Sequence, residues 1–174
     1  FSFDATKETY TISFTQSLAP TPGQPVKKPM HIPIAFGLLG SDGKDIQPSS
    51  VEGGDVHDGV IHLHRVSEAI TFHGIKERPV PSLLRGFSAP INLVSPLNAE
   101  DRAFLALNDS DPVARWQALT GIFTQALLEG AKRVRGGYLP ETDTKIVELA
   151  GRIASDESLD AAFRALCLTL PSES

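Results

Sequence analysis

Short alternations of apolar and polar residues run through the first part of the chain and predict β-strands. Tyr10, Ile12 and Phe14, for example, alternate with threonine and serine, as in a strand that buries one face. The predicted strands are Tyr10–Phe14, Ile32–Leu38, Val60–Arg65, Glu68–Phe72, Val80–Phe87, Ala89–Val94 and Arg102–Leu107. About seven short strands without intervening helices favour an antiparallel β-sandwich of immunoglobulin-like type. The last of these segments also fits a single helical turn.

The spacing of apolar residues changes to steps of three and four after residue 108, which predicts helices. Asp111 followed by Pro112 is a typical helix start, because the carboxylate caps free N–H groups and proline has none to satisfy. The first helix is expected to end at Gly136-Gly137. A second helix is predicted over about Thr142–Ala154 and a third after Ser158. Consecutive helices with short links suggest antiparallel pairs, as at the start of an α-solenoid.

Composition divides the chain at the same place. Ten of the thirteen prolines lie in residues 1–108, whereas the shorter stretch 109–174 holds nine alanines. Proline interrupts strands and alanine favours helices, so this division supports a β part followed by an α part. We therefore predict an immunoglobulin-like domain over 1–108 and, over 109–174, the first helices of a larger helical domain. The chain is expected to be a piece of a longer protein.

Charge and cysteine content narrow the function classes. Apolar residues make up 41 % of the chain, enough for a buried core, and no apolar run approaches the ~18 residues of a membrane span. The net charge of −5 argues against a nucleic-acid or anionic-membrane surface, which needs a concentrated positive field. The single cysteine, Cys167, excludes an intramolecular disulfide and a cysteine-based zinc cluster. It favours a reducing compartment, and we expect a cytoplasmic protein.

The histidines are the first candidates for chemistry. His62 and His64 alternate along a predicted strand, so both rings point to one face at a spacing able to bind a divalent metal. A third ligand would have to come from His57, Asp55 or His73. The same pattern fits polar residues on the solvated face of a strand, and no Glu-x-x-His or Cys-x-x-Cys motif supports a metal site.

Other motifs carry no recognisable chemistry. The chain lacks a Gly-x-Ser-x-Gly nucleophile motif, and Cys167 lies in an apolar-rich helix, where a buried, inert thiol is expected. Glu52-Gly53-Gly54-Asp55 is acidic and lacks the lysine and serine of a phosphate-binding loop. Lys132-Arg133-Val134-Arg135 is a basic run that suits a helix C-terminus. We therefore predict no catalytic, cofactor-binding or metal-binding residue in this chain.

Five segments of the chain form an ordered set. They are His31-Ile32-Pro33-Ile34-Ala35 with the following Gly43-Lys44, Pro79-Val80-Pro81-Ser82-Leu83-Leu84, Phe87-Ser88-Ala89-Pro90, Asn108-Asp109-Ser110-Asp111-Pro112 with Arg115-Trp116, and Leu168-Thr169-Leu170-Pro171-Ser172. Together they resemble the bacterial aminopeptidase N family of zinc-dependent alanyl aminopeptidases, in the same order and at similar spacing. Each short segment is weak alone, whereas five in order are specific. The resemblance covers essentially the whole chain.

The resemblance implies a position within a larger enzyme. Members of this family have an N-terminal β domain, a thermolysin-like catalytic domain, an immunoglobulin-like sandwich and a C-terminal helical domain that covers the active site. This chain resembles the sandwich and the first helices of the last domain. The family's zinc-binding His-Glu-x-x-His motif does not occur in it, so zinc is expected in a missing catalytic domain. The resemblance thus implies a non-catalytic module that spaces the catalytic domain from the helical cap.

The expected partners are therefore the parent's own catalytic and helical domains, with no nucleic acid and no membrane, and exposed helix faces would allow self-association. Two alternatives stay open. One is a stand-alone immunoglobulin-like module that binds a peptide or sugar, although Tyr138 is the only obvious loop aromatic for such a site. The other is a small metalloenzyme centred on His62 and His64.

Overall fold

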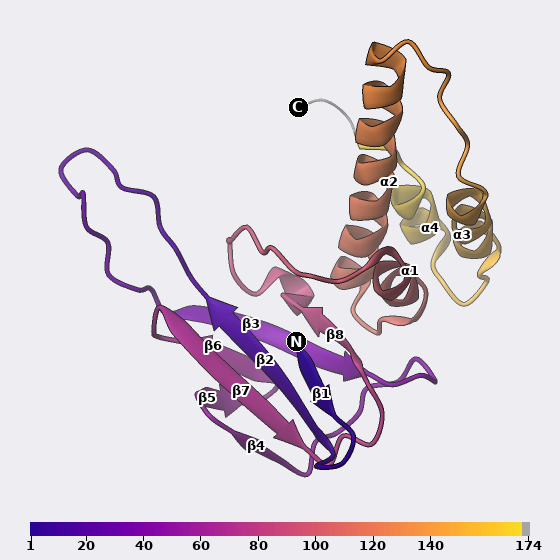
Figure 1. The fold of residues 1–174 in the computed structure, drawn as a ribbon. Helices are drawn as coiled ribbons and strands as arrows, with labels where there is room; N and C mark the ends of the chain where they lie inside the picture. Colours follow the sequence, from indigo (N-terminus) through magenta and orange to yellow (C-terminus); the bar gives the residue numbers. More distant parts are fainter. Residues whose placement is uncertain (172–174) are drawn as a thin grey trace. The chain divides into compact units, whose positions relative to one another are not determined.

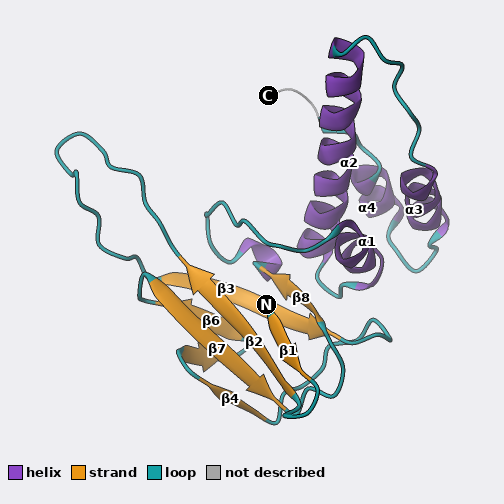
Figure 2. Cartoon of the chain, in the orientation of Figure 1, coloured by secondary structure: helices purple, strands orange, loops and turns teal. Residues whose placement is uncertain are grey.

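A computed structural model describes residues 1–171 and divides the chain into two compact units, the first spanning Phe1–Pro96 and the second beginning at Leu97. The first unit consists of strands with one short 3-10 turn, and the second consists of helices (Figures 1 and 2). This order confirms the predicted sandwich followed by antiparallel helices. The boundary lies between Pro96 and Leu97, whereas the sequence pattern suggested 108–109.

The first unit contains two four-stranded antiparallel sheets, with strand orders β1-β2-β7-β4 and β5-β6-β3-β8. The strands are β1 (Ser2–Asp4), β2 (Thr9–Thr15), β3 (Ile32–Leu39), β4 (Ser50–Glu52), β5 (Asp55–His57), β6 (Val60–Leu63), β7 (Ser67–His73) and β8 (Val80–Leu83). β1, β4 and β5 were not predicted, because three residues are too few to show an alternation.

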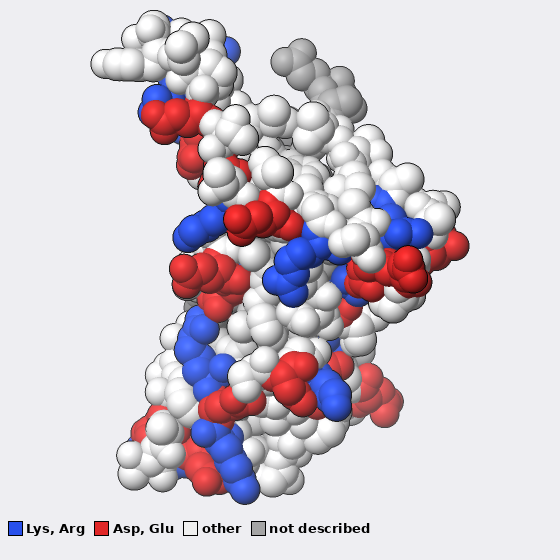
Figure 3. All heavy atoms as spheres, turned by 90° about the vertical axis from the view of Figure 1, so that its right-hand side faces the viewer, with Lys and Arg blue, Asp and Glu red and all other residues white. Residues whose placement is uncertain are grey.

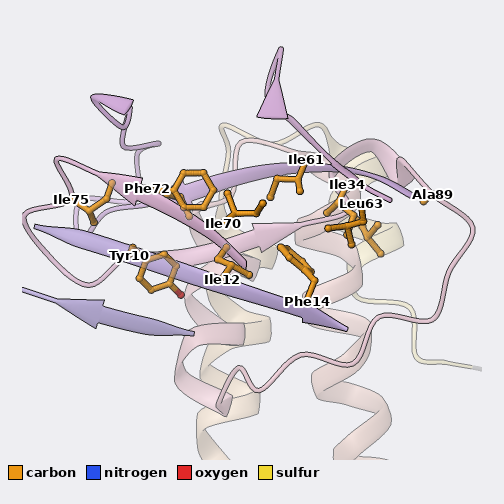
Figure 4. Packing of buried hydrophobic residues seen from close by; sticks show 12 residues of the cluster. Tyr10, Ile12, Phe14, Ile34, Ile61, Leu63, Ile70, Phe72, Ile75 and Ala89 are labelled. Carbon is orange, nitrogen blue, oxygen red and sulfur yellow. The ribbon is translucent and has the colours of Figure 1, made fainter. Parts of the chain in front are cut away.

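The core of the sandwich lies between the two sheets. Ile12 of β2 and Ile70 of β7 come from one sheet, and Ile34 of β3 and Ile61 of β6 from the other (Figure 4). All four are almost completely buried. The apolar positions of the alternating pattern thus face inward, and each such side chain contributes about 1.5–3 kcal/mol of burial free energy.

The predicted strand Ala89–Val94 is wrong. The segment is irregular, and Ile91 N–H donates to the Ala89 carbonyl over 2.9 Å, which closes a tight turn around Pro90. Ala89 is nevertheless buried, and Ile91 and Leu93 pack against the sandwich core. The alternating apolar residues are therefore explained by packing of a connection onto the core, without strand pairing.

The predicted strand Arg102–Leu107 is also wrong, since these residues lie in helix α1 (Ala99–Asn108). The Asn98 side chain accepts the Asp101 N–H at 2.7 Å and caps the helix start. The neighbours Leu105 and Ala106 are both buried. Ala106 belongs to the core of the helical unit, and Ala103 and Leu107 pack against that core, so the apolar residues of this segment form a helix face.

The other helices agree with the predicted ones: α2 (Pro112–Arg135), α3 (Thr144–Ser155) and α4 (Ala161–Cys167). Asp111 caps α2 as expected, because its carboxylate accepts the Ala114 N–H at 2.7 Å. The helices bury a core of their own, made of Ala106, Leu119, Phe123, Leu149, Ile153 and Cys167. Within residues 1–171, none of the helices has both the length and the apolar character to cross a membrane.

Candidate functional site: a histidine cluster on the sandwich

Four histidines gather on the outer face of the sheet that contains β5, β6 and β3. His57 lies in β5 and His62 in β6, while His64 follows β6 and His31 precedes β3. Asp55 of β5 pairs with His62, and Ile32 of β3 pairs with Leu63. Because side chains alternate across a strand, this register directs the histidines to one face and Ile61 and Leu63 to the core.

The imidazole rings of the four histidines are stacked on one another. The ring centroids are 4.3 Å apart for His57 and His62, 5.1 Å for His31 and His62, and 4.5 Å for His31 and His64. His31 Nε2 and His62 Nδ1 are 2.8 Å apart and share a hydrogen bond. The cluster thus joins two strands and the segment that leads into β3.

One carboxylate holds the two ends of this stack. Asp55 Oδ1 lies 3.1 Å from His57 Nδ1, and its Oδ2 lies 3.4 Å from His64 Nε2. Partial removal from water, the largest single influence, raises the pKa of Asp55. Hydrogen bonds from His57 and His64, with the charges of His57 and His62, outweigh it and lower the pKa below its usual value. The carboxylate therefore stays ionised beside the histidines.

The cluster unites four of the five residues considered as metal ligands, namely Asp55, His57, His62 and His64. The fifth, His73, lies in β7 of the other sheet, 3.3 Å from Glu52. Nowhere in residues 1–171 do three His, Cys, Asp or Glu side chains form a group that could hold a metal ion. The donor atoms of the cluster face one another in pairs, as His31 with His62 and Asp55 with His57 and His64.

His31 is the member of the cluster that the sequence analysis missed. Residues 16–30 separate it from β2, and it does not belong to the His62–His64 alternation. Its position becomes evident from the register of β3 and β6, which places the residue before Ile32 opposite the residue after Leu63. The register could have been sought by aligning the predicted strands Ile32–Leu38 and Val60–Arg65 in each possible antiparallel register.

A second feature is a groove of about 450 Å³ in the helical unit, between α1, α2 and the start of α3. Its apolar lining consists of Leu97, Ala103, Ile122, Ala126, Ile146 and Leu149. Charged side chains of both signs stand beside it, among them Glu129 and Lys145. On the face of the molecule in Figure 3, basic and acidic side chains are likewise interspersed, so no field of one sign develops there.

Cys167 is buried in the helical core, as predicted. Burial raises the pKa of its thiol, and the nearby charge of Arg115 opposes this effect only in part. A thiol that stays protonated is a poor nucleophile. Cys167 therefore serves packing in this unit.

Comparison with known families divides the chain in the same way as the structure. Residues 1–96 match a family model described as a domain of unknown function, DUF3458, with an Ig-like fold. Residues 99–174 match its companion model DUF3458_C, described as ARM repeats.

The chain is similar to three curated bacterial proteins named Aminopeptidase N. That of Escherichia coli is 29 % identical over 165 residues, covering 95 % of this chain and 19 % of the relative. That of Haemophilus influenzae is 28 % identical over 172 residues, covering 99 % of this chain and 20 % of the relative. That of Caulobacter vibrioides is 36 % identical over 139 residues, covering 80 % of this chain and 15 % of the relative. The chain thus spans a fifth or less of the length of these relatives.

A solved structure also shares the fold. The crystal structure of Legionella pneumophila aminopeptidase A in complex with aspartic acid matches 98 % of this chain and 18 % of that chain. The TM-score is 0.75 at 24 % sequence identity. The sandwich and the helices thus occur together in a longer protein.

Proposed function

The chain belongs to the DUF3458 family of Ig-like domains. From its similarity to longer aminopeptidases, we propose that it is a non-catalytic part of a larger aminopeptidase. That enzyme would use zinc to remove N-terminal residues from peptides. The observation that carries the proposal is the extent of the similarity to Aminopeptidase N of Escherichia coli, which covers 95 % of this chain. Both units are therefore matched within one longer relative.

Within the enzyme, the sandwich would hold the catalytic domain and the helical cap at a fixed spacing. Two features support this role. The sandwich has a continuous core, in which residues such as Ile12 and Phe72 are fully buried. Leu93 still packs against that core, and Asn98 already caps α1, so only a short link joins the two units.

The helices would begin a larger cap that continues in the longer protein. Several of their apolar side chains are about half exposed, namely Leu127, Leu128, Val147 and Leu166. Stacked helical repeats bury such faces against the next repeat, which agrees with the ARM-repeat description of the matched model. The expected partners are therefore other domains of the same protein, and the same exposed faces would permit self-association of the isolated chain.

The zinc ion would belong to another domain of the enzyme, and the single cysteine supports a cytoplasmic location for the whole. The alternative of a stand-alone binding module is not favoured, because the similarity to longer relatives runs through both units. For the metalloenzyme alternative, no group of three ligands within residues 1–171 offers support.

The proposal is tested by expressing the longer protein and the 174-residue chain separately. We expect the longer protein to hydrolyse an alanyl chromogenic amide, to lose this activity with a chelator and to regain it with zinc. The 174-residue chain should hydrolyse nothing and should purify without stoichiometric zinc. A longer protein without chelator-sensitive activity, or a chain that is active alone, would contradict the proposal.

The spacing role is tested by inserting Gly-Ser-Gly-Ser between Ser95 and Pro96 of the longer protein. The matched control carries the same insertion between Pro22 and Gly23, in an exposed loop of the sandwich. We expect only the insertion at Ser95 to change the ratio of activities on short and long peptides. Equal ratios in both variants would refute the spacing role.

A further inference from the structure

The short 3-10 turn η1 (Arg85–Phe87), which directly follows β8 (Figure 2), presents an aromatic ring to solvent. The side chain of Phe87 is 57 % exposed. Its neighbours on both sides along the chain are anchored, since Leu84 is 5 % and Ala89 3 % exposed and both belong to the sandwich core. The chain thus turns this ring outward between two fixed points.

Polar contacts also fix the backbone that carries Phe87. The Ser88 hydroxyl accepts the Ala35 N–H of β3 at 2.9 Å, and the Phe87 N–H donates to the Leu84 carbonyl at 3.0 Å. Arg85 donates through both terminal nitrogens to the Asp45 carboxylate, at 2.7 and 2.8 Å. The ring is therefore carried by a preorganised loop, whose position costs little further entropy on binding.

The backbone of Phe87 is itself strained. Its φ is 55°, in the left-handed region, and Leu84 has a φ of 63°. A residue with a Cβ and a bulky side chain pays for this conformation in free energy, and such strain persists only where the surroundings impose it. In the folded unit, this strained backbone leaves Phe87 57 % exposed.

From these observations, we propose that Phe87 is the anchor of a domain–domain contact and inserts into an apolar pocket on another domain of the longer protein. The proposal rests on the proposed function, because it requires domains beyond this chain. The relatives supply the necessary length, since this chain spans 20 % or less of each of them.

An apolar pocket is the partner that suits the exposed ring of Phe87. The guanidinium of Arg85, the nearest charge in sequence, is 14 % exposed and already bound to Asp45. A rigid aromatic residue gains free energy chiefly by burying its ring, and such residues dominate binding at interfaces. Preorganised loops with outward aromatic side chains are used in the same way in antibody paratopes.

The test compares hydroxyl-radical modification of Phe87 in the 174-residue chain and in the longer protein. Phe72, which is fully buried in the sandwich core, provides the lower limit of the rate in both. We expect the modification rate of Phe87 to fall by about tenfold or more in the longer protein, because a hot-spot ring becomes fully desolvated. Equal rates would overturn the proposal.

A variant gives the energetic test. Phe87→Ala should leave the unfolding midpoint of the 174-residue chain unchanged and should raise protease cleavage of the longer protein several-fold. The matched control is Val66→Ala, another exposed apolar residue of the sandwich, at 56 %. An effect of Val66→Ala equal to that of Phe87→Ala would contradict a specific anchor.

Aminopeptidase activity is measured on the same longer protein and keeps the two proposals apart. A protected Phe87 without peptidase activity would refute the proposed enzyme and leave the contact. An active enzyme with a fully reactive Phe87 would refute the contact alone.

Discussion

Gly37 of β3 provides a sharp test of the packing that holds β8 and its following turn. A Cβ added to Gly37 would overlap with the guanidinium carbon and both terminal nitrogens of Arg85. The guanidinium therefore lies directly over the backbone of Gly37. In Gly37→Ala, the flexible Arg85 side chain has to move away and give up its bonds to Asp45.

The expected loss of stability in Gly37→Ala follows from the hydrogen bonds that Arg85 gives up. Arg85 forms two charge-assisted hydrogen bonds to Asp45 and donates through Nε to the Ser82 hydroxyl at 3.1 Å. Asp45 is 30 % exposed, so water replaces part of this interaction, and a loss of about 1.5–3 kcal/mol is expected. Replacing glycine by alanine in a strand returns about 0.5–1 kcal/mol, because the unfolded chain loses freedom. The net loss for Gly37→Ala is therefore about 0.5–2.5 kcal/mol.

Hydrogen exchange of the slowest amides in β2 and β7 measures this change, because these amides exchange through unfolding of the sandwich. The decisive comparison repeats Gly37→Ala in an Arg85→Ala background, where no guanidinium is present. In that background, Gly37→Ala should leave the free energy of unfolding of the sandwich unchanged or raise it, whereas in the wild-type background it should lower it. An equal loss in both backgrounds would refute the assigned contact. Gly130→Ala, in α2 with open space around it, is the matched control and should stabilise the helical unit by about 0.5–1 kcal/mol.

Four further predictions concern the helices and the histidine cluster. Asp111→Ala should lower the stability of the helical unit by about 0.5–2 kcal/mol in urea unfolding followed by the single tryptophan, because the start of α2 loses its cap; an unchanged midpoint would contradict this. Ile153→Ala, at a site 1 % exposed, should cost about 2–5 kcal/mol, whereas Val147→Ala on the exposed face of the same helix should stay within about 0.5 kcal/mol. The lowered pKa of Asp55 stabilises the fold above the pKa of the unfolded chain, and this contribution is lost as the pH falls through the native value. The difference in thermal midpoint between the wild type and Asp55→Asn should thus vanish in acid, and parallel pH profiles would count against it. Because burial raises the pKa of Cys167, its reaction with a thiol reagent at pH 8 should be much slower in the folded chain than in urea, and equal rates would contradict its burial.

Long periodic segments were predictable because their pattern reports one buried face. β2 and α2 each repeat this signal several times, and both occur where the sequence analysis placed them. α1 was missed because it has only ten residues and its apolar side chains also alternate. For a short segment, the cap is the better signal, and Asn98 followed by an acidic first turn could have indicated the helix.

The candidate site was only partly predictable, since a spacing along one strand reports a shared face but not the register of the next strand. His62 and His64 were found from their alternation, whereas His31 depends on the pairing of β3 with β6. Asp55 was considered as a metal ligand, and its position opposite His62 instead lets it bind two histidines through hydrogen bonds.

The exposure of the Phe87 side chain could not be predicted from the sequence either, because it depends on backbone conformation. In the predicted strand Val80–Phe87, side chains would alternate between the two faces of the sheet up to the last residue. The face occupied by Phe87 would then follow from its position along the strand. The structure ends β8 at Leu83, because Leu84 adopts a left-handed φ and sends its side chain into the core. This one change of conformation breaks the alternation, so each later side chain is directed by the turn and by the anchoring of Ser88 and Ala89. An exposed aromatic residue held in this way owes its position to backbone geometry that no periodicity records, and such a residue is informative about partners outside its own unit.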